Sequence, residues 1–489
     1  MLHVAGAFKR SAADYKNVLA LSLSDQDKRD ALVGLSLSYG EIGDYDQKLS
    51  YAGRLIKITR TMDLCSRGKA LMMKGDALRD KGKYELSLKI LERSIRLFRR
   101  ALIGARTRRV DRRMIQDNIS KTYNSMGMAY NIQGRYASAL TFYKKSLGLT
   151  EKIGNLVATT QATNNIGLIY WYTGKYELAM DYFNRSLTFA QKTGFKSGIS
   201  AILGNIGLIY NDLEKSEIAL GYFLKAIAIS KEIGHQASTG THLNNAGLNY
   251  SNMSDLNNAH KFYAQSLNIF RKIGNARGMA MVLYNIGMNH CDLGDYNKAL
   301  IYESEAEKIA RGGDILEAVI RCDTLKARIF TGLKRYAAGI RIIKRAIRSA
   351  EKSKMEDLRI DAIKQHARTV IEEKNRGRLA GLSKEIAQLE DIYGQTTTDM
   401  TRCLLLVILV KYYLAVNQFE TTRKKLSELT AIARKSKDKY IIAETLIVQA
   451  MFNRATGRPY RPLLMKVRIL IRELGLCSLL DEIKQIERN

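Results

Sequence analysis

The chain has 489 residues and a formal net charge of +31, with only two prolines and five cysteines. So few prolines exclude proline-rich linkers and favour nearly continuous helix. The odd number of scattered cysteines favours reduced thiols in the cytoplasm over a disulfide framework. The longest apolar run, 404–410, is far shorter than the roughly 20 residues that span a bilayer, and neither a transmembrane segment nor a signal peptide is expected.

The N-terminal region, 1–113, shows divergent helical repeats with an arginine-rich insert at 96–113. Residues 9–24 are predicted to be the second helix of a pair whose first helix is missing, which suggests a chain cut from a longer protein or an end covered by a partner. The candidate basic patch comprises Arg99, Arg100, Arg106, Arg108, Arg109, Arg112 and Arg113. It is either a solvated helix face or a surface for a polyanion or acidic partner.

Residues 114–312 hold five copies of a pattern that returns every 40 residues. Each copy has a glycine, a tyrosine three residues later (His290 in the fifth copy), an alanine twelve later and an aromatic near sixteen later, with Tyr302 one place early. The glycines are Gly127, Gly167, Gly207, Gly247 and Gly287. A fixed period of this length indicates a stacked repeat architecture.

Within one copy, 164–194, apolar residues at helical spacing predict two helices joined by a turn at Thr173–Gly174–Lys175. A glycine inside a helix costs roughly 1 kcal/mol relative to alanine. We therefore expect each repeat glycine to allow close approach of the second helix. A further row of small residues is expected to contact the next unit; it comprises Ser146, Ser186, Ala226 and Ser266.

These residues resemble the tetratricopeptide repeat. The run 166–170 (Ile-Gly-Leu-Ile-Tyr), Ala179, Phe183 and Ser186 match its signature, whereas Thr163 holds the usual tryptophan place and the closing proline is absent. The unit exceeds the family's usual length of about 34 residues and is similar to the long repeats of kinesin light chains and bacterial signalling proteins. The resemblance implies an all-α, right-handed solenoid (a superhelix) of about 10 to 11 antiparallel helix-turn-helix units.

The repeat phase weakens after residue 312. Residues 313–475 are predicted to form divergent, basic units, and 476–489 a capping helix with Leu480, Ile483 and Ile486 on one face. A solenoid end requires such a cap to cover its last apolar surface.

The resemblance also implies that the first helices line a concave groove, with positions two and three before the repeat glycine and one and four after it facing inward. Asparagines there offer both donors and acceptors to a peptide backbone, leucines and methionines offer adaptable pockets, and Trp171 and Tyr172 are aromatic anchors. The alternative is that each asparagine ties its helix to the neighbouring unit. The candidate groove residues are Asn124, Asn164, Asn165, Leu168, Trp171, Tyr172, Asn205, Leu208, Asn211, Asn244, Asn245, Leu248, Tyr284, Asn285 and Met288.

No nucleotide-binding, hydrolase or zinc-protease motif is present, so neither catalysis nor a cofactor is expected. His290 is expected to pack in the core, and His242 and His260 could approach each other but have no carboxylate pattern for a metal site.

We therefore expect a non-enzymatic scaffold that binds a peptide or helical segment of a protein partner, which could be acidic. One alternative is the regulatory or sensor arm of a larger signalling protein (a kinase, ATPase or transcription regulator) truncated at its N-terminus. Another is electrostatic binding of nucleic acid or a membrane surface through the basic flanks, although no interleaved aromatics point to readout of nucleic acid. The oligomeric state stays open.

Overall fold

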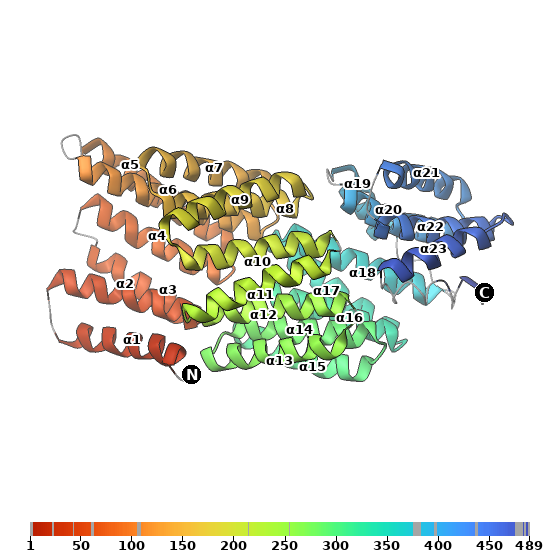
Figure 1. Cartoon of the computed structure of the whole chain (residues 1–489), viewed down its shortest axis with the longest axis horizontal. Helices are drawn as coiled ribbons and strands as arrows, with labels where there is room; N and C mark the ends of the chain where they lie inside the picture. The colour runs from red at the N-terminus through yellow and green to blue at the C-terminus, as the bar shows by residue number, and fades with distance from the viewer. Residues whose placement is uncertain are drawn as a thin grey trace.

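The computed structural model describes residues 3–21, 24–42, 44–59, 63–104, 109–213, 215–253, 255–374, 383–395, 399–435, 439–474, 483 and 486–487. Its regular elements are all helices, and after the first helix they form consecutive antiparallel pairs (Figure 1). The first eleven are α1 (His3–Ala20), α2 (Asp25–Ile42), α3 (Tyr45–Ile58), α4 (Leu64–Asp80), α5 (Tyr84–Gly104), α6 (Arg109–Ile132), α7 (Tyr136–Ile153), α8 (Leu156–Tyr172), α9 (Tyr176–Thr193), α10 (Lys196–Asp212) and α11 (Ser216–Glu232).

The remaining helices continue the same alternation to the C-terminal end. They are α12 (Gln236–Asn252), α13 (Leu256–Ile273), α14 (Ala276–Asp292), α15 (Tyr296–Gly312), α16 (Leu316–Gly332), α17 (Tyr336–Lys352), α18 (Glu356–Lys374), α19 (Ser383–Gln395), α20 (Asp399–Ala415), α21 (Phe419–Lys435), α22 (Lys439–Ala455) and α23 (Arg461–Leu474). The expected all-α solenoid of helix-turn-helix units is confirmed.

Glycines in the left-handed conformation end many of these helices. Gly174, between α8 and α9, has φ of 71°, and Gly194, after α9, has φ of 63°. Only glycine adopts this conformation without a steric penalty, so these positions set the short turns between antiparallel helices.

Within a unit, the repeat glycine lies directly under an aromatic ring of the second helix. A Cβ atom on Gly167 would lie 2.7 Å from the Phe183 ring, and one on Gly127 would lie 2.5 Å from the Tyr143 ring. Gly207 and Gly247 meet Phe223 and Tyr263 in the same way. The expectation that glycine allows close approach is confirmed, and the group it admits is a fully buried ring.

The fifth unit departs from this arrangement. Tyr302, expected to be a displaced copy of the buried aromatic, instead stacks on His290, with the ring centroids 5.4 Å apart. It belongs to a second aromatic row, which packs on the tyrosine three residues after the glycine, as Tyr222 does on Tyr210. The buried aromatic position itself is occupied by Glu303, whose side chain is fully buried.

The row of small residues also differs from the expectation. Ser146, Ser186 and Ser266 do not reach the next unit with their hydroxyls: each donates a hydrogen bond to a backbone carbonyl of the first helix in its own unit, at 2.6–2.9 Å. In the third unit the bond is reversed, because Ser200 of the first helix donates to the carbonyl of Ala226. A short side chain in this row therefore lets the two helices of one unit approach and bond.

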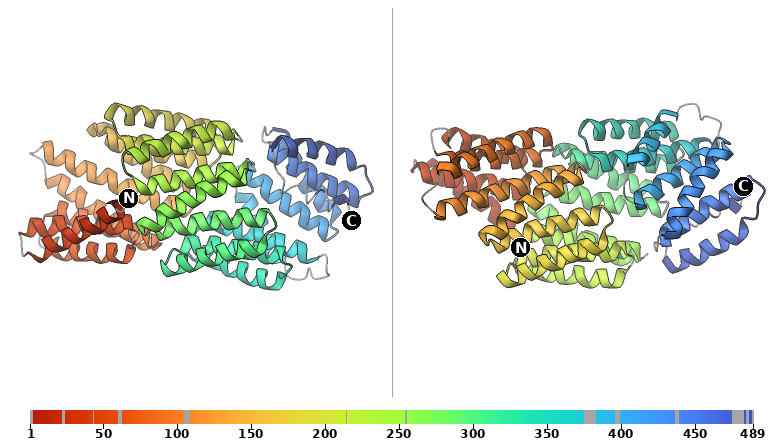
Figure 2. Two further views of the ribbon diagram at one scale, coloured as in Figure 1. Left: turned by 60° about the horizontal axis from the view of Figure 1, so that its bottom comes forward. Right: turned by 90° about the horizontal axis from the view of Figure 1, so that it is seen from above.

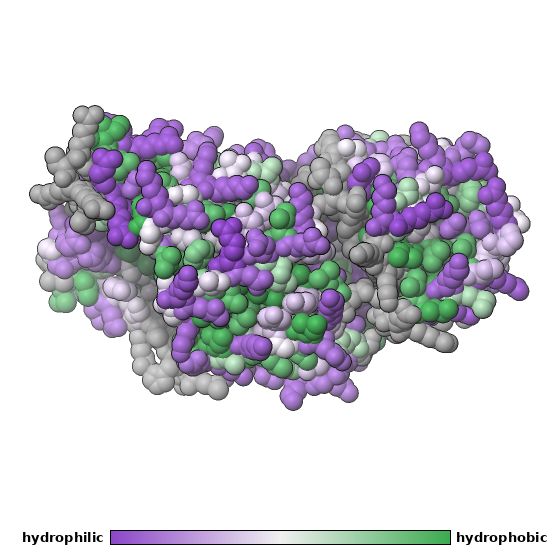
Figure 3. Space-filling view, turned by 45° about the horizontal axis from the view of Figure 1, so that its top comes forward, coloured by the Kyte–Doolittle hydropathy of each residue, from purple (hydrophilic) through white to green (hydrophobic). Residues whose placement is uncertain are grey.

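The pairs stack into a superhelix whose first helices lie inside. Each first helix contacts the first helix of the next unit, beginning with the pair α4 and α6 and ending with the pair α20 and α22. Successive second helices contact one another less. The views in Figure 2 show the coil from two further sides, with α19–α23 forming a lobe at the C-terminal end. The side of the molecule drawn in Figure 3 is mostly hydrophilic, with hydrophobic areas over the main body and the C-terminal lobe.

Successive turns of the superhelix touch. Helix α1 contacts α13 (Figure 1), and the buried Tyr84 at the start of α5 joins an apolar cluster built mainly from α16–α18 and α20. Lys354, in the turn after α17, forms an ion pair with Glu85. The first turn is thus packed against the second along its edge.

The arginine-rich insert lengthens two helices. Helix α5 has 21 residues and α6 has 24, against 17 or 18 for the helices of the regular units. At the other end, Ile483 and Ile486 are buried against α22 and α23. Leu480 and most of the remaining segment 476–489 lie outside the described residues. Within the described part of the chain, we find no helix long and apolar enough to cross a membrane.

Candidate functional site: the inner face of the first helices

The predicted groove residues lie along the inner face, where most are half-buried. Tyr172 is exposed and Asn244 is buried. Because half-buried side chains on a concave face are fixed by their neighbours yet reachable from solvent, this face is the candidate binding surface.

Asparagines on this face bond from one unit to the next. In each case the residue two before the repeat glycine donates to the residue three before the glycine of the preceding unit. The bonds run from Asn165 Nδ2 to Asn124 Oδ1 at 2.8 Å, from Asn205 Nδ2 to Asn164 Oδ1 at 2.9 Å, and from Asn285 Nδ2 to Asn244 Oδ1 at 2.9 Å. These bonds tie neighbouring first helices together, as the alternative interpretation expected.

One rung of this ladder is replaced. Asn245 would bond to position 204, but that residue is glycine, and the His242 ring fills the space instead: a Cβ on Gly204 would lie 2.5 Å from it. His242 Nε2 lies 3.0 Å from Ser200 Oγ. Burial lowers the pKa of His242 to about 4, so the ring is a neutral packing group at physiological pH.

A second lateral contact holds the predicted aromatic anchor. Trp171 Nε1 donates to Asp212 of the next unit at 2.6 Å. The Trp171 ring lies 4.8 Å from that of Tyr172, which stacks on Tyr136 at 5.6 Å. The rings of Trp171, Tyr172 and Tyr136 form one aromatic cluster at the edge of the inner face. Asn211, at the same repeat position as Trp171, also bonds to the next unit: it accepts a hydrogen bond from Asn252 at 3.2 Å.

The position one after the repeat glycine forms a row that we call the apolar row. It comprises Met128, Leu168, Leu208, Leu248 and Met288, all half-buried. At the next two places in the same 40-residue register stand Arg328 and Arg368. The inner face therefore changes from neutral to cationic after α14.

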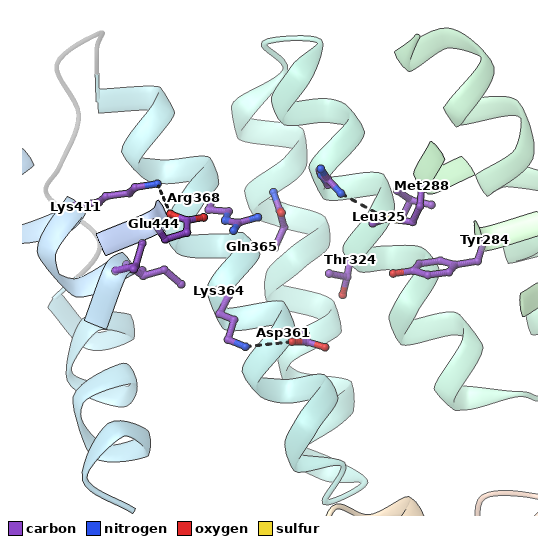
Figure 4. Close-up of a pocket in the computed structure, with 13 residues that line it drawn as sticks. Tyr284, Met288, Thr324, Leu325, Asp361, Lys364, Gln365, Arg368, Lys411 and Glu444 are labelled. Carbon is purple, nitrogen blue, oxygen red and sulfur yellow. Dashed lines mark hydrogen bonds and ion pairs between the residues drawn. The ribbon is translucent and has the colours of Figure 1, made fainter. Parts of the chain in front are cut away.

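At this change the inner face deepens into a pocket of about 380 Å³ (Figure 4). First helices of five successive units line it: α14, α16, α18, α20 and α22. The lining residues are Tyr284, Met288, Thr324, Leu325, Arg328, Asp361, Lys364, Gln365, Arg368, Val407, Ile408, Lys411 and Glu444. Of these, Tyr284 and Met288 were predicted, and extending the 40-residue register beyond 312 would have found Arg328 and Arg368.

The charged groups of the pocket are partly paired. Lys364 Nζ lies 3.4 Å from an Asp361 oxygen, and Lys411 Nζ lies 3.7 Å from a Glu444 oxygen. Burial raises the pKa of Tyr284 above its usual value, so its hydroxyl stays protonated as a hydrogen-bond donor. Although burial opposes its charge, the neighbouring Asp292 carboxylate raises the pKa of Arg328.

The described residues include only part of the predicted basic patch. Arg99 and Arg100 near the end of α5, and Arg112 and Arg113 near the start of α6, are exposed. Arg99 donates to the Tyr123 hydroxyl at 3.0 Å. Arg106 and Arg108 of the predicted patch lie outside the described residues, as does the side chain of Arg109.

The histidines form no metal centre in the described residues. His260 lies beside His290, with ring centroids 5.3 Å apart, rather than beside His242. His290 is a packed core residue, as expected. The described chain holds no group of three or more His, Cys, Asp or Glu residues arranged for a metal ion.

Cys291, Cys322 and Cys403 are buried thiols without a disulfide.

Profiles of the tetratricopeptide-repeat family match residues 68–100, 118–192, 198–272 and 238–312. The chain contains tetratricopeptide repeats, and the matched segments coincide with α4–α5 and α6–α15. No curated protein sequence matches it.

Three solved structures are examples of those that are similar to this chain. The quorum sensor NprR from B. thuringiensis is 14% identical over 72% of this chain and 97% of its own, with a TM-score of 0.46. Aspartyl phosphate phosphatase F from Bacillus subtilis is 16% identical over 73% and 91%, with a TM-score of 0.45. A signal transduction ATPase with a tetratricopeptide repeat sensor from Pyrococcus horikoshii is 17% identical over 82% of this chain and 54% of its own, with a TM-score of 0.40. At these identities the likeness is one of helical architecture and extends no further.

Proposed function

We propose that this protein is a non-enzymatic interaction scaffold whose inner face holds a peptide or helical segment of a partner protein. The observation that carries the proposal is the ladder of asparagine pairs along successive first helices. Tetratricopeptide repeats are interaction modules, and the buried thiols are consistent with a reducing cytoplasm.

The asparagine pairs support both structure and binding. An asparagine amide has two donor hydrogens and an acceptor oxygen with two lone pairs. The bond between Asn165 and Asn124 uses one donor of the first and one acceptor site of the second. The remaining groups are held in fixed rotamers, which reduces the entropy cost of bonding a partner backbone.

Apolar and aromatic groups flank these amides. Leu168 and Leu208 belong to the apolar row, and Tyr172 exposes 45% of its surface beside Trp171. Apolar pockets between fixed amides suit a segment that alternates backbone bonding with buried side chains. The mode of binding is therefore docking along the groove.

Affinity capture with two leucine variants tests this proposal. Leu208→Lys places a charge on the inner face of α10, and Leu224→Lys makes the same change at an exposed position on α11. We expect L208K to lose the protein partners that wild type retains at high salt and L224K to keep them. Asn245→Ala, which breaks no asparagine pair, should also weaken capture. Equal capture by all variants, with unchanged helical content by circular dichroism, would refute groove binding.

A further inference from the structure

The pocket across α14–α22 differs chemically from the rest of the inner face. Four cations line it, namely Arg328, Lys364, Arg368 and Lys411, against two carboxylates, Asp361 and Glu444. At the repeat positions of Lys364, Gln365 and Arg368, the first helices of the five regular units present neutral residues, mainly asparagine, leucine and methionine. The inner face thus has a neutral end and a cationic end.

The cationic excess arises at defined positions of the repeat. Arg328 and Arg368 replace apolar-row residues, and Lys364 occupies the place held by Asn124, Asn164 and Asn244 in the regular units. Because these places face inward in every unit, the cations point into the groove rather than onto an outer face. A solvated outer helix face would not need this placement.

Internal carboxylates neutralise only part of this charge. Asp361 pairs with Lys364, Glu444 with Lys411, and Asp292 at the rim with Arg328. Arg368 is exposed, and no acid within the described residues lies at ion-pair distance from its guanidinium. Figure 4 shows its side chain beside Gln365, among the other lining groups. An exposed guanidinium with a planar fork of donors matches a carboxylate.

We propose that this pocket recognises acidic side chains of the bound segment, with Arg368 as the principal contact. The proposal rests on groove binding and adds the chemical class and direction of the ligand: Asp or Glu residues lie over α16–α20, and a neutral stretch lies over α6–α14. Charge complementarity selects this occupant, since Arg328, Lys364 and Lys411 are paired with carboxylates and the guanidinium of Arg368 is left for the charge of a ligand.

Random-peptide phage display against the whole protein tests this inference without a known ligand. Wild type should enrich peptides that carry Asp or Glu at one end of a neutral stretch. The most enriched peptide, labelled with fluorescein, then serves as the probe in fluorescence anisotropy. Arg368→Gln should weaken its binding by roughly ten- to hundredfold, since hydrogen bonds to charged groups contribute about 1.5–3 kcal/mol. Lys144→Gln, at an exposed site on α7, is the matched control and should bind normally.

A charge swap provides the sharper readout. Arg368→Glu should reject the acidic probe and bind a version with Lys at the acidic position. Enrichment of peptides without acidic bias, or equal probe binding by R368Q and wild type, would overturn the proposal of an acidic-side-chain pocket. If L208K still fails to bind the probe, groove binding would stand in either case. Absence of any enriched peptide would contradict both proposals. Displacement of the probe by single-stranded RNA, with no acidic bias among peptides, would instead assign the cations to nucleic acid.

Discussion

Lys354 and Glu85 are 269 residues apart in the chain, yet Lys354 Nζ lies 2.9 Å from Glu85 Oε1. The contact joins the turn after α17 to the start of α5, where Tyr84 is buried in the neighbouring apolar cluster. Burial raises the pKa of Tyr84 to about 12, as expected for a phenol removed from water. The ion pair and the ring together hold one turn of the superhelix against the next.

The two parts of this junction should contribute unequally. Both ion-pair partners are more than half exposed, and such pairs contribute about 0–1 kcal/mol. We expect Tyr84→Ser to open the superhelix and increase its radius of gyration, measured by small-angle X-ray scattering. The double swap E85K/K354E should leave the radius unchanged. An unchanged radius in Y84S would show that other contacts hold the turns.

Lys334 occupies a turn position that strains its backbone. Its φ is 59°, whereas Gly134, Gly174 and Gly294 hold the corresponding place in other units. A side chain in this conformation costs roughly 1–2 kcal/mol. Replacing it with glycine removes this strain, but the greater conformational entropy of glycine in the unfolded chain offsets part of the gain in stability. Lys334→Gly should therefore stabilise the protein by about 0.5–1 kcal/mol.

The reverse change, Gly174→Lys, should destabilise by a similar amount, and urea unfolding midpoints compare the two variants with wild type. Lys354, with φ of 55°, shares the strain but also pairs with Glu85. Lys354→Gly should thus gain less than K334G. A destabilised K334G would contradict the strain argument.

The repeat glycines should respond differently to one added methyl group. In Gly167→Ala the new Cβ would lie 2.7 Å from the buried Phe183 ring, and overpacking of this kind costs about 1–3 kcal/mol. In Gly287→Ala the nearest atom is Leu325 Cδ2 at 3.2 Å. That methyl group can shift, and alanine gains up to about 1 kcal/mol in a helix. Thermal unfolding should therefore show a loss of stability in G167A and none in G287A, and equal losses would refute the ring-contact explanation.

Glu303 should make stability depend on pH. Burial raises its pKa to about 7, although Lys326 Nζ lies 3.2 Å from one oxygen. The folded state therefore keeps this proton at pH values where the unfolded chain loses it. Stability should fall as pH rises from about 4.5 to 7 and should be independent of this group above 7.

Glu303→Gln keeps the shape and removes the titration. Compared with wild type, its unfolding free energy in urea should fall less, or not at all, between pH 4.5 and 7. Glu305, on the same helix but with 42% of its side chain exposed, gives the control variant Glu305→Gln. An identical pH profile for wild type and E303Q would show that Glu303 does not titrate in this range.

The sequence by itself determined the units and their internal packing. Each glycine, its aromatic partner and the small residues act between two helices of one pair, so the contacts recur at a fixed offset that the 40-residue period reveals. The same logic supported the candidate groove, because inward-facing places repeat with the period. It did not distinguish Tyr302 from the buried aromatic series, since helical positions one residue apart differ by orientation rather than by composition.

Only the tertiary structure decided how units far apart meet. The direction of the Asn165–Asn124 bond, the replacement of one rung by His242, and the approach of Lys354 to Glu85 depend on where neighbouring helices lie. The pocket likewise collects Tyr284 and Glu444 from first helices four units apart. Small rotations between successive units accumulate into the superhelix, so the meeting of distant residues follows from the sum of those rotations and not from any local pattern.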